Sequence, residues 1–422
     1  MKLIITNKSL LTFLAAFVVL FGATLPVHAE VPEINTAFVK QVEQVYDQLE
    51  KQYKNLYEND LRQAVDDFDR FMAISASERS YFENVLKEDK QYLVNLLQED
   101  YRSLNDIWSS QPLYKPRLTE YSKHVMTNSA NGTLKAYLNQ IDKTYTTGLY
   151  WKYHNEIDPA YSTSLMWKYK NQVNPNYATG AMNRYASMLD TKDRQSVLGK
   201  LRYEIDIEAE QSTMWKYSQG QLSVIEAKSR MDNLFVNGTK QLQTTRDIAI
   251  SLLKNVRQDT VEGITKLRDD TARDLIRLRQ DTLEKILRER EIQFGSRIEA
   301  ASLSISFDPI HVLVNNKLLQ LEPSPMLVEG NTLVPLRAIA ERLGAKVTWN
   351  QEEQSVTLSG KNTDIYLQIG SRQAWVNGAA VELEAAPQLI DWVTMVPVRF
   401  VSESFDADVK WDSLMRTVII TR

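Results

Sequence analysis

The sequence predicts a multidomain protein: an all-α N-terminal region, a helical bundle or coiled coil, followed by a small duplicated α+β domain. Three observations lead to this fold class. Apolar residues recur every three or four positions across residues 34–110, and a 16-residue and then an 11-residue repeat occupy 117–228 and 241–294. The last quarter of the chain then carries one sequence pattern twice, at a constant shift. These repeats indicate the architecture of the chain, but they do not indicate that it catalyses any particular reaction.

Residues 1–29 are expected to form a secretory signal peptide. Two lysines precede an apolar stretch, and a small-residue cleavage pattern ends at Ala29, so Glu30 should begin the mature protein. An uncleaved membrane anchor is the alternative. We favour cleavage because Gly22 and Pro26 interrupt the apolar stretch, which falls short of the ~20 residues that span a bilayer.

Composition narrows the class of protein further. The chain of 422 residues has no cysteine, which excludes disulfides, thiolate metal sites and a lipid-modified cysteine. Without the two signal lysines, 48 basic side chains face 54 acidic ones, a net charge of −6 that gives no electrostatic case for nucleic acid. No later apolar run could cross a membrane. We therefore expect a secreted, extracellular protein that is either released or held non-covalently at the cell surface or cell wall.

Residues 30–116 are predicted to form a pair of amphipathic helices. Residues 75–78 have the capping-box form Ser-x-x-Glu, which predicts the start of the second helix, and a short connection implies an antiparallel pair. Two apolar stripes support the two helices: Phe38, Val42, Val45, Leu49, Tyr53 and Leu56, then Phe82, Leu86, Leu93, Leu97, Leu104 and Trp108.

Residues 117–228 are predicted to form a helical region of 16-residue repeats. Asp158-Pro159 and Asn174-Pro175 suit the N-cap and first position of a helix, so we expect short helices of about four turns with a break in each repeat. The fifth position of the repeat is aromatic in six of seven copies: Tyr121, Tyr137, Tyr153, Tyr169, Tyr185, Leu201 and Tyr217.

Residues 229–305 are predicted to form one long helix with an 11-residue repeat. The context of Arg257 recurs at Arg268 and Arg279, and a period of 11 favours a straight or slightly right-handed coiled coil. An 11-residue amphipathic repeat can also lie on a lipid surface, but such helices carry bulky apolar residues and a basic polar face. Helix packing, or self-association through the coiled coil, is therefore preferred. Threonines occupy the middle of the stripe: Thr260, Thr271 and Thr282.

Residues 309–422 are predicted to form the duplicated α+β domain. Val334-Pro335-Leu336-Arg337 returns as Val396-Pro397-Val398-Arg399, and Trp349 returns as Trp411. In each copy the proline stands where a helix should begin, and two short alternating strands with a polar turn follow that helix.

This stretch resembles the copper amine oxidase N-terminal-like domain, also called the stalk domain. The pattern "VPLR…A…LGA.V.W" is matched by residues 334–349, while Phe405-Asp406-Ala407 departs from Leu-Gly-Ala in the second copy. The resemblance implies a non-catalytic accessory module of secreted and surface proteins of Gram-positive, spore-forming bacteria. It does not imply amine oxidation, whose copper and quinone belong to another domain. Six motif residues are assigned structural roles: Pro335, Arg337, Trp349, Pro397, Arg399 and Trp411.

The sequence offers no catalytic, cofactor-binding or metal-binding residues, and we predict that the protein is not an enzyme. A copper site needs clustered imidazoles, yet His124, His154 and His311 are far apart in sequence. Arg337 and Arg399 could grip an anionic ligand. We favour structural ion pairs, repeated because the fold is repeated.

Aromatic residues of the 16-residue repeats are the candidate binding surface. They could stack on the glycan chains of a cell wall, or they could form core, which we favour because aromatic side chains bury so much area. The candidate polymer-binding residues are Trp151, Tyr153, Trp167, Tyr169, Trp215 and Tyr217.

The preferred hypothesis is a secreted or cell-surface, non-catalytic structural or interaction protein whose helical coiled coil carries a stalk-like domain. The alternative is a module that binds cell-wall glycan or another surface polymer. A hydrolase hidden in the helical region is a third hypothesis that rests on no motif. Expected partners are a wall polymer, another surface protein or a second copy of the chain, with no nucleic acid and no membrane span after signal cleavage.

Overall fold

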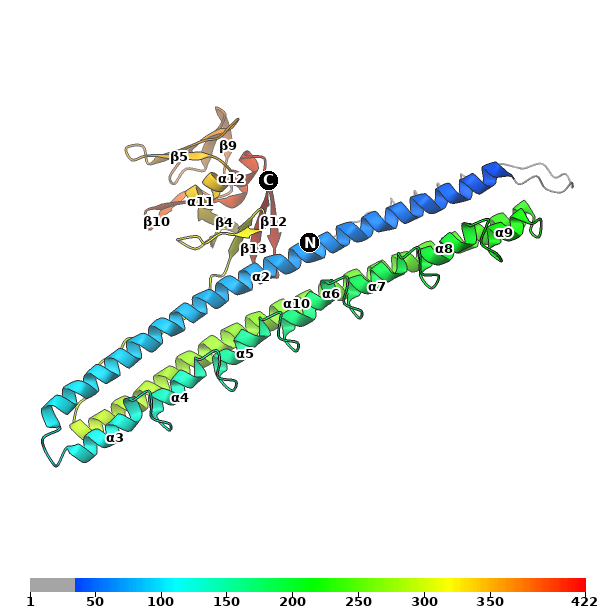
Figure 1. Cartoon of the computed structure of the whole chain (residues 1–422). Coiled ribbons are helices and arrows are strands. Elements are labelled where there is room, and N and C mark those ends of the chain that lie inside the picture. The colour runs from blue at the N-terminus through cyan, green and yellow to red at the C-terminus, as the bar shows by residue number, and fades with distance from the viewer. Residues whose placement is uncertain (1–34) are drawn as a thin grey trace. The chain divides into compact units, whose positions relative to one another are not determined.

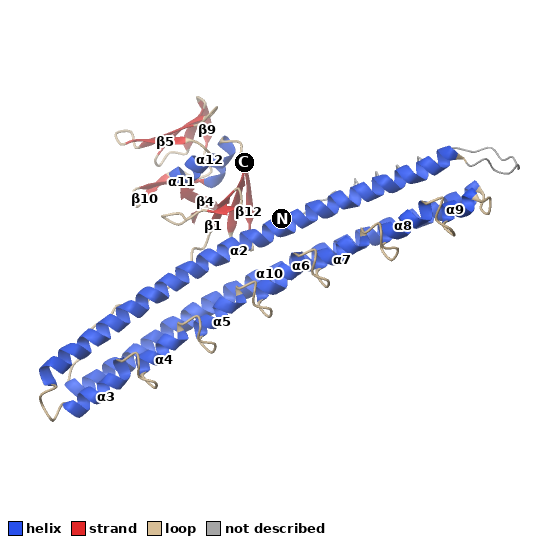
Figure 2. Ribbon diagram, viewed as in Figure 1, coloured by secondary structure: helices blue, strands red, loops and turns tan. Residues whose placement is uncertain are grey.

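The computed structural model describes residues 35–422, so the expected signal peptide lies outside the described residues. A helical N-terminal region precedes a domain of small sheets and short helices, which confirms the predicted fold class (Figures 1 and 2). The chain divides into two compact units. Among the described residues, the first combines residues 35–62 with residues 174–252, and the second combines residues 63–173 with residues 253–422. No helix in the described part of the chain is long and apolar enough to span a bilayer.

Two long helices run through the helical region. Helix α2 spans Thr36–Trp108 and helix α10 spans Val224–Phe294 (Figure 1). The predicted helical pair within residues 30–116 is therefore wrong, because α2 continues through the supposed capping box. Ser75 is buried in the middle of α2, and the Glu78 carboxylate accepts a bond from Arg268 on α10 instead of capping a helix start. A glutamate that pairs with a distant helix and a glutamate that caps a helix start fit the same sequence pattern, so the pattern alone does not distinguish them.

Short helices, joined by loops, connect α2 to α10. Those of the repeat region keep the 16-residue spacing. The five in its middle have eight or nine residues, which make a little over two turns, and the last has six, so they are shorter than the four turns expected. They are α3 (Lys115–Val125), α4 (Thr133–Gln140), α5 (Leu149–Glu156), α6 (Leu165–Val173), α7 (Ala181–Met188), α8 (Val197–Ile205) and α9 (Thr213–Ser218).

The predicted Asp-Pro helix caps are also wrong. Asp158 shapes the loop, where its carboxylate accepts the N–H of Ala160 at 2.8 Å. The helix begins later, after Ser164, whose hydroxyl accepts the N–H of Trp167 at 3.0 Å. The true cap is the last residue of each of the first six 16-residue repeats, a serine or a glycine. Glu156 reaches across the loop to accept the N–H of Leu165 at 2.8 Å.

Within the second unit, the residue numbers of contacting pairs give the helix directions. Arg279 contacts Asp89 and Arg290 contacts Asp100, both across 190 residues, so α10 runs parallel to α2. Tyr121 contacts Asp100 whereas Tyr137 contacts Asp89, so the row of short helices runs antiparallel to both. One 16-residue repeat of the short-helix row thus advances as far along the helices as one 11-residue repeat of α2. The extra residues of the longer repeat form the loops.

The first unit has the same three-part helical construction. Arg246 of α10 binds Asp60 of α2 through Nε and Nη2, at 2.6 and 2.9 Å. The hydroxyl of Tyr53 donates to the Thr239 carbonyl at 3.3 Å, and burial raises the pKa of Tyr53 to about 12. A core of aromatic and aliphatic side chains fills the space between the helices.

The C-terminal domain contains two copies of one set of elements, displaced by the same interval that takes Pro335 to Pro397. The first copy comprises β1 (His311–Val314), β2 (Lys317–Leu318), β3 (Met326–Val328), β4 (Asn331–Pro335), α11 (Leu336–Arg342), β5 (Lys346–Asn350) and β6 (Ser355–Ser359). The second comprises β8 (Gln373–Val376), β9 (Ala379–Glu382), β10 (Gln388–Ile390), β11 (Val393–Pro397), α12 (Val398–Ser404), β12 (Asp408–Asp412) and β13 (Thr417–Thr421). Strand β7 (Asp364–Gln368) has no counterpart.

The two copies are interlocked through their sheets. Strands β4 and β11 pair antiparallel in the order β10-β11-β4-β3, and Val334 faces its own counterpart Val396. The other sheets, β12-β13-β1-β2 and β5-β6-β7-β8-β9, each mix strands of both copies. β13 pairs directly with β1 in parallel, whereas β7 is inserted at the equivalent place between β6 and β8. Because every sheet mixes strands of the two copies, neither could keep its strand partners without the other.

Candidate binding surfaces

A buried Tyr–acid–Arg cluster recurs along the helices of the second unit. In one cluster the carboxylate of Asp89 accepts a bond from Arg279 Nε at 2.7 Å and another from the Tyr137 hydroxyl at 2.6 Å. Arg279 is 2 % exposed, so its charge is compensated by the Asp89 carboxylate with almost no contribution from water. Burial, and then the Asp89 carboxylate, raise the pKa of the Tyr137 hydroxyl, which keeps it protonated as a donor.

Neighbouring clusters follow at the 11-residue spacing of α2 and α10. Asp100 accepts bonds from Arg290 Nε and the Tyr121 hydroxyl, both at 2.8 Å. In the opposite direction Glu78 binds Arg268. The buried carboxylates and guanidinium groups are therefore engaged with each other. They have the geometry of a structural network, and Glu78 also lines a cavity of about 120 Å³ beside His311.

The cluster at Arg257 differs because it includes the C-terminal domain. Its Nε lies 3.9 Å from Asp67 of α2, while its Nη2 binds Asp412 at the end of β12. Leu414 and Met415, in the turn after β12, join the hydrophobic core that lines the helices of the second unit. One arginine of the repeat thus holds the C-terminal domain as well as the helices.

The structure places the candidate polymer-binding residues in two groups. The tyrosines are 0 to 4 % exposed, so their assignment to a binding surface is wrong: Tyr153, Tyr169 and Tyr217. The tryptophans are half-buried: Trp151, Trp167 and Trp215. Trp151 meets the exposed ring of Tyr161 edge-on, with 6.2 Å between the ring centroids. A role of the tryptophans in polymer binding stays a prediction.

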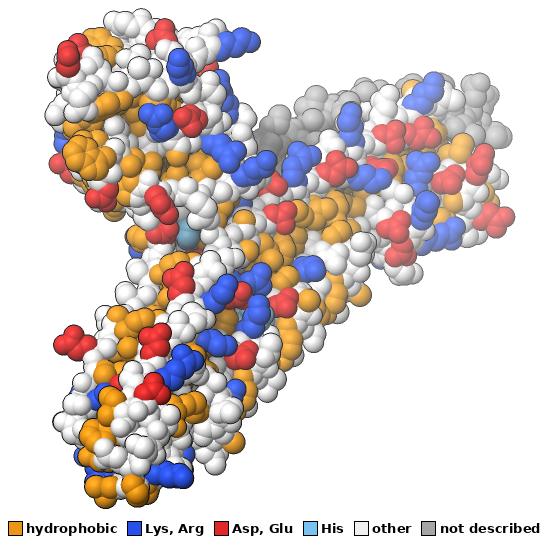
Figure 3. Space-filling model, turned by 60° about the vertical axis from the view of Figure 1, so that its left-hand side comes forward, with side chains coloured by type: hydrophobic (Ala, Val, Ile, Leu, Met, Phe, Trp, Pro, Cys, Tyr) orange, Lys and Arg blue, Asp and Glu red, His pale blue; other side chains and the backbone are white. Residues whose placement is uncertain are grey.

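The three histidines among residues 35–422 occupy separate environments. His124 Nδ1 lies 2.7 Å from the Thr133 hydroxyl, His154 Nδ1 lies 3.5 Å from Glu83, and His311 Nε2 lies 3.4 Å from Glu78. Within residues 35–422 no group of three or more His, Cys, Asp or Glu side chains could hold a metal ion. Acidic and basic side chains are interspersed over the helices on the face drawn in Figure 3.

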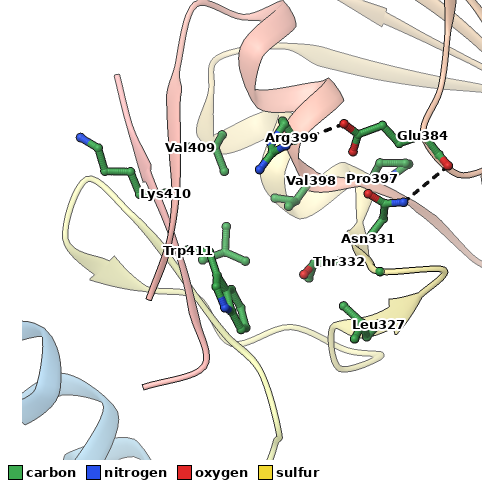
Figure 4. A pocket seen from close by; sticks show the side chains of 12 residues that line it. Leu327, Asn331, Thr332, Glu384, Pro397, Val398, Arg399, Val409, Lys410 and Trp411 are labelled. Carbon is green, nitrogen blue, oxygen red and sulfur yellow. Dashed lines mark hydrogen bonds and ion pairs between the residues drawn. The ribbon is translucent and has the colours of Figure 1, made fainter. Parts of the chain in front are cut away.

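One cavity of the C-terminal domain brings together residues of the VPLR-type motif. Pro397, Arg399 and Trp411 line a groove of about 410 Å³, together with Leu327 of β3 (Figure 4). The motif brings these residues together because β11 ends at Pro397, which starts α12, while Trp411 lies on β12. Sequence reasoning assigned these residues to the architecture and missed that they share a groove.

The charged residues of the groove are exposed and loosely paired. Arg399 is 56 % exposed, with Nη1 at 3.7 Å from Glu384 and Nε at 3.8 Å from Glu403. Its counterpart Arg337 is 62 % exposed and lies 3.9 Å from Glu341. These are surface ion pairs, which contribute little to stability and leave the guanidinium groups accessible.

Residues 313–420 match the copper amine oxidase N-terminal domain, in agreement with the resemblance of the C-terminal stretch. The match is to the N-terminal, non-catalytic domain of those enzymes. A protein described as "Protease inhibitor" from Brevibacillus choshinensis is 32 % identical over 110 residues, which is 25 % of this chain and 34 % of that relative. The chain thus spans about a third of the length of the relative that it matches. No solved structure matches the chain.

Proposed function

We propose that this protein is a secreted or cell-surface, non-catalytic structural and interaction protein, in which an extended helical region carries and presents the stalk-like domain. The observation that supports it most directly is the repeated Tyr–acid–Arg cluster. In Asp89, Arg279 and Tyr137 the ionisable groups are buried and satisfied by each other, so they stabilise a helical scaffold and leave no free catalytic group there.

The attachment of the C-terminal domain also supports a presenting role. Asp412 and the turn after β12 engage the helices, whereas the groove around Trp411 and Arg399 is open to solvent. A scaffold that fixes one side of a domain and exposes another suits an interaction protein. The relative described as a protease inhibitor is named for an action on another protein, which fits this class of function.

Binding of cell-wall glycan is the second candidate, and the half-buried tryptophans favour it. Trp151 with Tyr161 places two aromatic rings at the surface of one repeat, and such rings offer an apolar face on which a sugar ring can stack. Trp167 occupies the same position of the next repeat. The buried tyrosines take no part in this candidate site.

Small-angle scattering of the mature chain tests the scaffold. A compact chain of residues 30–422 should have a radius of gyration of about 21 Å. Helix α2 alone, with 73 residues, rises about 110 Å when straight, so we expect a radius above ~30 Å. A radius near the compact value would contradict an extended helical region.

Sedimentation with purified cell wall separates the two candidates. The mature chain is compared with a variant carrying Trp151→Ala, Trp167→Ala and Trp215→Ala, with helix content as the folding control. A scaffold without glycan affinity stays in the supernatant in both forms. Wall binding by the parent that is lost in the folded variant would support the glycan module instead.

A further inference from the structure

The tight turn between β10 and β11 carries a tryptophan whose side chain lies almost wholly in water. Trp392 is 89 % exposed. Ile390 pairs with Val393, so Asp391 and Trp392 are the two residues of the turn, and their φ angles are positive, at 48° and 65°. Asp or Asn followed by Gly is usual in such a turn. The first copy follows this rule, because Gly330 stands at the equivalent position with a φ of 80°.

This tryptophan costs the folded chain free energy in two ways. A bulky residue at positive φ brings its Cβ close to its own backbone, and an exposed indole keeps a large apolar surface in water. A glycine, as in the first copy, would avoid both costs. Burial of the ring against another molecule would offset them, and residues held in sparsely populated backbone conformations cluster at functional sites.

The groove at Trp411 is a recess that fits such a ring. Its apolar floor includes the buried side chains of Val398 and Val418, and Val418 belongs to β13, so the groove lies over the face of a sheet. Leu327 and Trp411 line it while remaining 60 and 45 % exposed (Figure 4). A Cβ on Gly330 would meet nothing within 4 Å, so the groove is open there. A cavity of ~150 Å³ holds a benzene ring, so the groove of about 410 Å³ admits the larger indole.

The tryptophan and the groove lie at opposite ends of the sheet β10-β11-β4-β3. Gly330 immediately precedes β4, whereas Trp392 immediately precedes β11. These two strands pair antiparallel, so they start at opposite ends of the sheet. Pro397, at the end of β11, pairs with Leu333 of β4 and lines the groove. Trp392 therefore lies at the far end of the sheet from the groove of its own chain, and the groove that it can enter is that of another copy.

We propose that Trp392 of one chain inserts into the groove at Trp411 of a second copy of this chain, so that the C-terminal domains associate head to tail. The indole covers the exposed surfaces of Leu327 and Trp411 and removes its own ring from water. The two contacting surfaces are different, so each added chain offers a free tryptophan or a free groove to the next, and the assembly is open-ended. This proposal goes beyond the scaffold role and does not depend on whether the helical region is extended.

The size of the contact sets its strength. One aromatic side chain buries about 150–250 Å². Leu389 of β10, which is 40 % exposed, adds apolar surface at the same end of the sheet. Stable interfaces bury at least ~1,200 Å² in total, so this contact alone is weak. Chains should therefore associate when they are concentrated, as proteins crowded on a surface are, and separate on dilution.

Analytical ultracentrifugation of the full mature chain tests the contact, from about 10 μM to about 1 mM, the range in which a weak complex forms. The average mass of the wild type should rise with concentration. Trp392→Gly should stay monomeric without melting at a lower temperature, because glycine adopts this turn without steric cost. Leu327→Lys, a change at an exposed position, should also stay monomeric, because it places a charge in the groove. Val381→Ala removes part of another exposed apolar side chain of the domain and should associate as the wild type does.

A mixture of the two monomeric variants tests the head-to-tail arrangement. Trp392→Gly keeps the groove and Leu327→Lys keeps the tryptophan, so the mixture should form dimers of one chain of each and nothing larger. A wild type that stays monomeric at the highest concentration would overturn the proposal, as would association that survives in either variant or a mixture that stays monomeric. Association lost in Trp392→Gly but kept in Leu327→Lys would mean that the tryptophan binds elsewhere than the groove. Scattering of dilute, separate chains tests the helical scaffold, so failure of this contact and failure of the scaffold are distinguishable.

Discussion

At the scale of single residues, the helical region depends on carboxylates and guanidinium groups that lie almost out of water. Asp89 and Arg279 are 7 and 2 % exposed, and Tyr137 completes their hydrogen bonding. Removal of such a pair from water costs free energy, and each charge offsets this cost for the other. Loss of one partner therefore lowers the unfolding free energy strongly. It also fixes which turn of α10 faces which turn of α2, because any slip would leave charges buried without a partner.

Removal of one partner from this cluster should be strongly destabilising. Asp89→Ala leaves Arg279 charged and buried, and we expect a loss of about 3–5 kcal/mol in unfolding free energy. Combining Asp89→Leu, Arg279→Met and Tyr137→Phe removes the whole polar cluster and should restore most of that loss. Urea denaturation followed by far-UV circular dichroism measures both. Asp270→Ala is the control, since its partner Arg273 is 71 % exposed, and it should hardly shift the midpoint.

His154 should give the protein a pH-dependent stability near neutrality. Burial lowers its pKa, against the opposing effect of Glu83, with Arg79, Lys143 and Asp158 as the other charged neighbours. The unfolded chain therefore takes up a proton on this side chain at a higher pH, near 6.5, than the folded chain does. Stability from this group is complete above that pH and is lost as the pH falls below it.

The measurement is the melting temperature at pH 8 and pH 5.5, for the wild type and for His154→Gln. The wild type should lose more on acidification than the variant does, and the two should differ little at pH 8. Equal slopes for the two proteins would show that His154 stays as accessible to protons in the folded chain as in the unfolded one.

At the scale of elements, the two repeat lengths are parts of one construction. The interval between Tyr121 and Tyr137 is matched by the interval between Asp100 and Asp89, so each layer of the bundle takes one 16-residue repeat from the short helices and one 11-residue repeat from each long helix. The extra residues of the 16-residue repeat form the loop between one short helix and the next. The loops are closed by an Asx-type turn such as that of Asp142 with Thr144, which also lowers the pKa of Asp142.

One complete layer should therefore be removable if all three helices are shortened together. In the first unit, one layer consists of residues 43–53 of α2, residues 190–205 of the short-helix row and residues 232–242 of α10. The concerted deletion should preserve cooperative unfolding and the helix content per residue, because the remaining residues keep their register. Deleting residues 190–205 alone shifts the short helices against α2 and α10 by a layer, and the melting temperature should fall steeply. Equal behaviour of the two deletions would refute the layer construction.

The role of a residue could be predicted from the sequence where it depended on local periodicity, and could not where it depended on a partner far along the chain. The buried tyrosines and the 11-residue stripe through Ile264 were visible because periodicity reports burial directly. The role of Glu78 was misjudged, because a capping glutamate and one that binds a distant arginine have the same local pattern. The groove at Trp411 was missed since it needs Leu327 and Trp411, which are far apart in sequence and belong to different sheets, to line one cavity. An exposed leucine on a short edge strand was the only local signal.

At the scale of the whole molecule, the duplication has become asymmetric where the C-terminal domain meets the helices. Asp412 and Asn350 form the same turn, each accepting the backbone N–H groups two and three residues ahead. After Asn350 come Glu352 and its neighbour, both exposed, whereas Leu414 and Met415 follow Asp412 and pack on the helices of the second unit. Of these two turn residues, Asp412 binds Arg257 of α10. The second copy contributes this turn to the attachment, while the first copy contributes His311, whose Nε2 lies 3.4 Å from Glu78, and Asn316, which accepts a bond from Arg70 at 3.1 Å.

This attachment predicts that the C-terminal domain keeps a fixed distance from the helices that it contacts. Because the chain has no cysteine, Lys285→Cys on α10 and Lys361→Cys after β6 accept two spin labels without background. Electron–electron distance measurement should give one narrow distribution for the otherwise native chain. Adding Leu414→Glu and Met415→Glu places two charges into an apolar contact and should broaden that distribution strongly. Glu352→Gln, in the equivalent turn of the first copy, should leave it narrow. A broad distribution in the native chain would mean that the domain is tethered, and the presenting role would then rest on the length of the helices alone.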